Sequence, residues 1–348
     1  MGVWVSVLAL TMAALAQDPA IDDGAEPPVA LEEPAAPAVS PIQSHATDLN
    51  LAAQEQARSG STTPSKGHVA LSALAGLLVA GPDLSTRDAG AGVVALCAWS
   101  DAAGDSAALG VAIATAEWAL SDRSLDGNGF SELGDPTQPA ALADSVAMGQ
   151  ALLALHSSTG DPVWLAQAQA TAGFVASRFL SGGPGFASES ALGAERPVSR
   201  AENRDTVVFM STLGRRTGEP RWSGMARHGL AWLRASPDAD GATADAARAV
   251  ELRPPHLVVV GPTDDLATQA LYGAARALPL EHRWLEWRDP QVWLNSPSAV
   301  PVPLVGPPTV WLCDGMDCGE PLRTVDDVTN LGAVIGDSPL AQGDTAAE

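Results

Sequence analysis

Apolar side chains recur at steps of three and four residues through the middle of the chain, the spacing that places them on one face of a helix. One such row contains Leu142, Val146, Gly149 and Leu153. Comparable rows are Leu109, Ile113, Ala116 and Leu120; Leu165, Ala168, Ala172, Val175 and Phe179; and Trp222, Met225, Gly229 and Trp232. The pattern predicts a series of amphipathic helices.

Three similar turns separate these helices, at 103–105, 159–162 and 217–220. Their glycines, Gly104, Gly160 and Gly218, lie 56 and 58 residues apart. Glycine suits the left-handed position that ends a helix, and the Asp or Glu that follows suits the start of the next. A repeat of about 57 residues fits two helices and two loops, the unit of an α/α toroid.

The fold class expected from this repeat is mainly α, a partial α/α toroid of antiparallel helical hairpins over 67–250. The helices are too few for a closed ring of about twelve. A strand anywhere within 67–250 would contradict the prediction.

The pattern changes near residue 254. Leu257–Val260 is typical of a buried strand, and Thr263 is placed to cap a helix that follows it. A second strand is expected at Val310–Cys313 and a last helix at Val325–Leu331. These elements predict a small α/β element over 254–332. It is included in the partial α/α barrel at 67–332, and a flexible tail follows at 333–348.

The first 66 residues differ from the rest. Residues 3–16 are apolar and end in Ala14-Leu15-Ala16, which is typical of a signal peptide spanning 1–16 and predicts a periplasmic or secreted protein. The alternatives are an uncleaved anchor and a wrongly assigned start codon. Residues 17–66 are rich in proline, alanine and acids, and they predict a disordered linker.

Composition excludes several classes of function. The 348 residues hold 41 acidic and 19 basic side chains, a formal charge of −22, which disfavours nucleic-acid binding. No apolar run is long enough to span a bilayer. The three cysteines and six histidines show no metal-ligand spacing, so no metal or other cofactor is expected.

Several segments in order resemble the C-terminal part of the spermatogenesis-associated, thioredoxin-domain-containing family. The similar segments are 139–144 (PAALAD), 152–161 (LLALHSSTGD), Arg196-Pro197, Asn203 and 313–321 (CDGMDCGEP). The resemblance covers about 85–332 and implies a six-hairpin α/α barrel of the glycosidase and sugar-epimerase type, following a thioredoxin-like domain in that family.

The departures from this family are also informative. The thioredoxin-like domain and the first half of the barrel are expected to be absent, and no C-x-x-C is present to support thiol oxidoreductase chemistry. Ser145 stands where the family has a tyrosine, and 200–204 (RAENR) stands where it has a P-S-G-N-S motif. We therefore interpret the chain as a degenerate, secreted relative.

Sugar chemistry requires two carboxylates, or an acid and a base, facing one cavity. The resemblance favours Asp144 as catalytic, with a simple helix N-terminal acid as the alternative. Asn203, Glu202 and Asp126 are candidate binding residues. The structural alternatives are that Asn203 caps a helix, that Glu202 is a solvated acid and that Asp126 belongs to an Asn-Gly turn. The full set of loop-end acids is Asp126, Glu132, Asp135, Asp144, Glu189, Glu202 and Asp205.

Other residues are expected to be structural. His156 is predicted to be a core histidine, and Trp284, Trp287 and Trp293 are predicted to cover the edge of the barrel, with sugar stacking as the alternative. In an oxidising compartment Cys313 and Cys318 are close enough in sequence to form a disulfide, with two reduced thiols as the alternative.

Two classes of function remain. The favoured hypothesis is a non-catalytic binding or scaffold module whose partner is a carbohydrate or another protein. The alternative is a carbohydrate-active enzyme, of glycosidase or sugar-epimerase type, that uses a carboxylate-lined cleft; this rests on analogy of fold.

Overall fold

The structure is a computed structural model of the full chain. It describes residues 40–59, 65–79, 84–126, 128–134, 137, 139–180, 185–190, 198–235, 241–251, 255–278, 284–293, 302–314 and 317–336. The proposed signal peptide, the proline-rich part of the proposed linker, Asp135, Arg196-Pro197 and the tail beyond 336 lie outside these residues.

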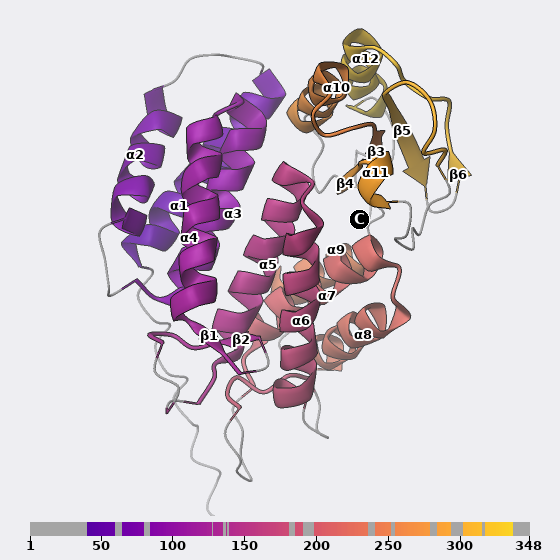
Figure 1. The fold of residues 1–348 in the computed structure, drawn as a ribbon. Helices are drawn as coiled ribbons and strands as arrows, with labels where there is room; N and C mark the ends of the chain where they lie inside the picture. The colour runs from indigo at the N-terminus through magenta and orange to yellow at the C-terminus, as the bar shows by residue number, and fades with distance from the viewer. Residues whose placement is uncertain are drawn as a thin grey trace, which may run out of the picture. The chain divides into compact units, whose positions relative to one another are not determined.

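The helices form two rows (Figure 1). Each helix of the inner row, α1, α3, α5, α7 and α9, packs on the next, and the outer helices α2, α4, α6 and α8 each pack on the inner helix before them in sequence. Their bounds are α1 Pro41–Ser59, α2 Ser65–Val79, α3 Thr86–Ala103, α4 Ser106–Asp122, α5 Leu142–Thr159, α6 Pro162–Phe179, α7 Arg200–Thr217, α8 Pro220–Ala235 and α9 Gly241–Glu251. This is the expected partial α/α toroid.

The three repeated turns have the predicted chemistry. Gly104, Gly160 and Gly218 have φ of 69°, 73° and 69°, and each donates its backbone N–H to the carbonyl four residues earlier. Asp105 and Asp161 then accept hydrogen bonds from the first N–H groups of the next helix. The hairpins thus begin and end where the repeat predicts.

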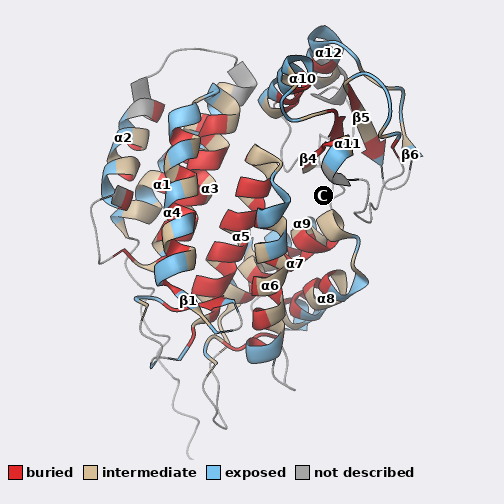
Figure 2. Cartoon of the chain, viewed as in Figure 1, coloured by how far each residue is buried: buried red, intermediate tan, exposed pale blue. Residues whose placement is uncertain are grey.

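Small residues set the spacing of the inner row. A Cβ on Gly90 of α3 would lie 2.8 Å from the backbone of Ala147 in α5, and a Cβ on Gly149 of α5 would lie 2.4 Å from the ring of Phe209 in α7. Figure 2 shows that α5, in the inner row, is buried along most of its length, whereas α4, in the outer row, exposes a broad face.

The prediction of a disordered linker over 17–66 is wrong for 41–59, which form α1. Ala46, Leu49 and Ala53 lie three or four residues apart and are buried, and α1 packs on α3. Ser40 caps the helix by accepting the N–H of Gln43, and its hydroxyl donates to Asp88 at 2.7 Å. Alanine-rich composition concealed this apolar row.

The expectation of no strand between 67 and 250 also needs correction. Two short antiparallel strands, β1 Ser124–Leu125 and β2 Gly129–Phe130, connect α4 to α5. Asn128, in the turn between them, has a φ of 68°. The strands serve as a connection and leave the hairpin architecture unchanged.

The α/β element contains a four-stranded sheet of order β4-β3-β5-β6. Its strands are β3 His256–Val260, β4 Trp284–Arg288, β5 Thr309–Asp314 and β6 Asp317–Cys318, and its helices are α10 Leu266–Ala277, α11 Pro290–Trp293 and α12 Val325–Gly336. β3 pairs parallel with β4 and antiparallel with β5. The expected strands at 257–260 and 310–313 and the helix at 325–331 are present, but the helix continues to Gly336, so the prediction of a flexible tail from 333 is wrong for 333–336.

Two details of the α/β element differ from expectation. Asp265, not Thr263, caps α10, whereas the backbone N–H and hydroxyl of Thr263 both donate to Asp289. Trp284 and Trp287 lie within a strand, β4, that the sequence analysis did not identify. The side chain of Trp293 is not described.

Polar contacts attach the α/β element to the helical rows. Arg276 of α10 forms an ion pair with Asp101 at the end of α3, at 2.9 Å, and the Tyr272 hydroxyl donates to the carbonyl of Ser157 in α5. None of the helices in the described ranges is both long and apolar enough to cross a membrane.

Candidate active site

Charged residues gather at the N-terminal ends of three neighbouring inner helices. Arg87, Asp144 and Glu202 lie in the first turns of α3, α5 and α7, respectively. The close contacts of α3 with α5 and of α5 with α7 place these helices side by side with their N-termini at the same end. We call Arg87, Glu132, Asp144, Glu189 and Glu202 the carboxylate cluster.

Asp144 is 3% exposed. Burial, and then the negative charge of Glu132, raises its pKa to about 7, although the guanidinium and the backbone N–H of Arg87 act in the opposite direction. Its carboxyl group is therefore balanced between neutral and ionised near neutral pH, as a general acid–base residue requires.

Glu202 is the second partly buried carboxyl of the cluster. Burial raises its pKa, while a hydrogen bond from the Ser188 hydroxyl and the charge of Arg87 lower it. Its Oε2 atom is buried and has no hydrogen-bond partner among the described residues. Because a buried carboxyl oxygen without a partner is costly, this atom is available to a ligand or a proton.

The loops that carry the cluster are held by backbone hydrogen bonds. Thr86 at the start of α3 donates its N–H to the carbonyl of Glu132 at 3.1 Å and its hydroxyl to Ser131. Leu142 at the start of α5 donates its N–H to the carbonyl of Ser188 at 2.8 Å. Each helix start is thus fixed to the loop that supplies another member.

The side chain of Asn203, a candidate binding residue, makes its hydrogen bonds within the protein. Its side chain is fully buried, and its amide bonds both backbone groups of Phe186 and the carbonyl of Ser199. It is not the helix cap either, because Ser199 accepts the N–H of Glu202 and caps α7. Asn203 positions the 185–190 loop.

The remaining candidates lie at the rim or farther away. Glu132 and Glu189 are exposed, and both raise the pKa of a buried neighbour, Asp144 and Glu202, respectively. Asp205 raises the pKa of Glu202, while its own carboxylate forms an ion pair with Arg204. Asp126 is exposed in the turn between β1 and β2, where the structure gives it no role in the cluster.

Sequence reasoning missed Arg87 and Ser188. The starts of α3 and α7 can be recognised in the sequence, because Ser85 with Asp88 and Ser199 with Glu202 follow the S-x-x-acid spacing of a capping box. That spacing locates Arg87 inside a first helical turn. Ser188 lies in an irregular loop, and no local pattern predicts its contact with Glu202.

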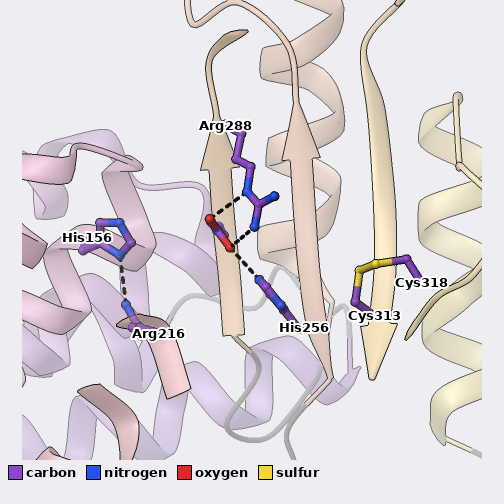
Figure 3. Close-up of polar contacts among 7 residues, drawn as sticks. His156, Arg216, His256, Arg288, Cys313 and Cys318 are labelled. Atoms are coloured by element: carbon purple, nitrogen blue, oxygen red, sulfur yellow. Dashed lines mark hydrogen bonds and ion pairs between the residues drawn. A yellow bond between two sulfur atoms is a disulfide. The ribbon is translucent and has the colours of Figure 1, made fainter. Parts of the chain in front are cut away.

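His156 is a core histidine. It is 3% exposed, and burial together with the nearby Arg216 lowers its pKa to about 3, so the ring is neutral. The guanidinium of Arg216 lies 3.2 Å from its Nδ1 (Figure 3).

A separate buried group lies in the α/β element. The carboxylate of Glu286 is 2.8 Å from Nε of Arg288 and 2.8 Å from Nε2 of His256.

Cys313 and Cys318, the pair that the sequence analysis expected to be bonded, are joined by a disulfide (Figure 3). The two residues face each other across β5 and β6, with Cα atoms 4.0 Å apart.

Within the described residues, no group of three or more His, Cys, Asp or Glu side chains could hold a metal ion, and this includes the carboxylate cluster.

Comparison with known proteins identifies the fold. The chain matches no protein-family profile and no curated protein. The Lin0763 protein of Listeria innocua has a TM-score of 0.51 at 9% identity, covering 88% of this chain and 87% of its own. The fold is therefore that of the six-hairpin glycosidase-like α/α toroids.

Two mannanases are similar at a lower level. A GH76 α-mannanase of Bacteroides thetaiotaomicron has a TM-score of 0.47 at 15% identity, covering 56% of this chain and 61% of its own. An inactive variant of the GH76A α-1,6-mannanase of a Salegentibacter species, in complex with α-1,6-mannotriose, has a TM-score of 0.49 at 12% identity, with 68% of each chain covered. The chain spans about three fifths of the length of the Bacteroides enzyme.

Proposed function

We propose that the carboxylate cluster is the active site of a carbohydrate-active enzyme of glycosidase or sugar-epimerase type. The observation that carries this proposal is the buried carboxyl group of Asp144. Its pKa is raised to about 7, and the charges of Glu132, Arg87 and Glu202 act on it. A carboxyl group that is partly protonated at neutral pH can donate a proton to a glycosidic or hydroxyl oxygen and take one back.

The roles assigned to the cluster follow from burial and charge. Asp144 is the general acid–base residue, and Glu202, with its unpartnered Oε2, is the second carboxyl. Arg87 and Glu132 tune Asp144 in opposite directions. The substrate class comes from the resemblance of 139–144 and 152–161 to the thioredoxin-domain-containing family, of which we propose the chain to be a divergent relative.

The non-catalytic module favoured by the sequence is the second candidate. The replacement of the family's tyrosine by Ser145 supports it, because the Ser145 hydroxyl is used structurally, as acceptor for the N–H of Phe130. A scaffold alone gives no reason to bury Asp144 with a raised pKa, because this costs stability as the pH rises from about 4 through about 7. The cluster therefore favours an enzyme.

We also propose a periplasmic or secreted location. The apolar segment at 3–16 supports it, and so does the Cys313–Cys318 disulfide, because such bonds persist mainly in oxidising compartments.

Incubation with a panel of oligosaccharides, with turnover and binding followed separately, tests the function. The wild-type protein is expected to convert at least one substrate, and Asp144→Asn is expected to lower kcat at least ~100-fold while binding persists. Asp126→Asn, in the exposed β1–β2 turn, is the matched control and should leave kcat unchanged. Binding without turnover by the wild-type protein would establish the module instead.

A further inference from the structure

A cavity of about 440 Å³ lies on the inner row, lined by α3, α5, α7, α9 and the first residue of β4. Its volume is that of a site for a small organic molecule. Val94, Leu153 and Phe209 supply apolar wall, whereas Gln150, Arg215, Arg216 and Trp284 supply polar groups. The lining residues of α7, 208–216, lie six or more residues beyond Glu202, so the cavity is separate from the carboxylate cluster.

Arg215 and Arg216 place two guanidinium groups in the cavity wall, and no carboxylate of the described residues forms an ion pair with either. Arg216 donates to the Leu153 carbonyl and the Ser157 hydroxyl and contacts His156. Arg215 donates to the Ala249 carbonyl and to hydroxyl groups. Every one of these partners is a neutral group.

The carboxylates nearest to Arg216 are committed elsewhere. Glu286 and Asp101 both influence the guanidinium of Arg216 through their charge. Glu286, however, is bound by Arg288 at 2.8 Å, and Asp101 is bound by Arg276 at 2.9 Å. This part of the described structure therefore holds four guanidinium groups and two carboxylates, in a protein whose formal charge is −22.

Two buried donors in the same wall also lack partners. Nε of Arg216 and Nε1 of Trp284 are shielded from solvent and make no hydrogen bond within the described residues. The Trp284 ring is held by stacking on His256, with ring centroids 3.4 Å apart. Native proteins rarely leave buried donors unsatisfied, so each of these N–H groups calls for an acceptor.

The location of Arg215 and Arg216 in the last turn of α7 has a structural explanation, because cations favour a helix C-terminus. That effect does not require burial beside a cavity. At the mouth, the exposed Asp245 and Arg248 of α9 carry opposite charges and leave the excess positive charge of the interior unchanged.

We propose that this cavity binds a small organic oxyanion, a carboxylate or phosphate carried on a ring of about the size of one sugar. The oxyanion offsets the charge of Arg215 and Arg216. It accepts hydrogen bonds from the Arg216 and Trp284 N–H groups after a small shift of these side chains toward the cavity, because both nitrogens are shielded in the structure. The body of the ligand packs against Leu153 and Phe209. A bare inorganic ion would leave most of the 440 Å³ to water.

The test is calorimetric titration of the full-length protein with D-glucuronate, D-glucose 6-phosphate and neutral D-glucose. At least one anionic sugar is expected to bind ten or more times more tightly than glucose, and the two anions distinguish a carboxylate site from a phosphate site. Equal binding of all three sugars, or binding of none, would overturn the proposal.

Variants assign the binding to this cavity. Arg216→Gln and Trp284→Phe are each expected to weaken the anion at least tenfold; Trp284→Phe keeps an aromatic ring on His256, so it reports even if Arg216→Gln fails to fold. Arg221→Gln, an exposed arginine on α8 paired with Glu219, is the matched control. Asp144→Asn should bind the anion normally, which separates this site from the proposed enzyme activity. Unchanged affinity in Trp284→Phe and in a folded Arg216→Gln would place the anion elsewhere and refute the site.

Discussion

Asn203 of α7 holds both backbone groups of Phe186, accepting its N–H at 2.8 Å and donating to its carbonyl at 2.9 Å. Phe186 is itself fully buried, and it lies in the described segment 185–190 that leads to Ser188 and Glu189 beside the carboxylate cluster. One amide therefore pairs both backbone groups of Phe186, in addition to backbone bonds such as that from Leu142 to Ser188. It fixes the loop relative to Glu202, the residue before Asn203 in the sequence.

Asn203→Ala is expected to lower the free energy of unfolding by about 2 to 4 kcal/mol, because it leaves two buried backbone groups unpaired. Denaturant unfolding measures this change. Asn330→Ala, on an exposed face of α12, is the control and should change stability by less than about 0.5 kcal/mol. An Asn203→Ala protein of unchanged stability that has lost ligand binding would make Asn203 a binding residue after all.

Asp144 is expected to destabilise the protein at alkaline pH. Its pKa is about 7 when folded and about 3.9 in an unfolded chain, so the folded state binds the proton more tightly. Its contribution to stability is therefore fully present below about pH 4 and is lost as the pH rises through about 7.

Replacing the carboxyl by an amide removes this dependence. Asp144→Asn is expected to be more stable than the wild-type protein by about 1 to 3 kcal/mol at pH 8, with little gain at pH 4. Thermal or denaturant unfolding at both pH values checks the difference, and Asp126→Asn should show no such change. A gain that is equal at both pH values would mean that Asp144 does not titrate between them.

The helical repeat was predictable because its determinants are local. A glycine in the left-handed conformation followed by an acidic cap appears directly in the sequence at Gly104-Asp105 and Gly160-Asp161. The whole of α1 was missed because its buried residues, Ala46 and Ala53 beside Leu49, are mostly alanines, which also occur in linkers. β4 was missed because its tryptophans and charged residues do not form an alternating apolar pattern.

The candidate site was predictable only in part. Asp144 and Glu202 could be selected because each is an acid at an inner helix start. Their shared environment depends on contacts across long stretches of sequence, such as Leu142 with Ser188 and Thr86 with Glu132. The roles of Asn203 and Arg216 also depend on such contacts, since the same side chains in an exposed helix would be solvated.

The disulfide predicts a specific labelling pattern. Alkylation of the unfolded, unreduced protein is expected to modify one cysteine, Cys97, because Cys313 and Cys318 are bonded. In the native protein even Cys97 should resist, since burial raises the pKa of its thiol. Mass spectrometry of protein expressed in an oxidising compartment measures the alkylation of each cysteine in both the unfolded and the native protein.

Removing the bond tests its energetic role. Cys313→Ser with Cys318→Ser is expected to cost about 2 kcal/mol, the chain-entropy value for so short a loop. Cys97→Ser in the buried α3 position is the comparison, because it removes no covalent bond. Alkylation of Cys313 and Cys318 in the unreduced protein would contradict the disulfide.

Gly160 and Gly104 provide a matched pair for measuring how the α/β element rests on the helical rows. Both glycines end an inner helix in the left-handed conformation, with φ of 73° and 69°. A Cβ on Gly104 meets no atom within 4 Å, whereas a Cβ on Gly160 would lie 2.8 Å from Cβ of Trp287 in β4. The two sites thus share a backbone conformation and differ in their packing.

Gly104→Ala should therefore cost only the strain of a left-handed alanine, about 1 kcal/mol. Gly160→Ala carries the same strain and must also displace β4, so we expect a loss of about 2 to 4 kcal/mol in unfolding free energy. Because Trp287 packs on Tyr272, which donates to Ser157, this displacement should also raise amide hydrogen exchange in β4 and α10. Equal costs for the two substitutions, with unchanged exchange in β4, would show that the α/β element does not depend on the contact at Gly160.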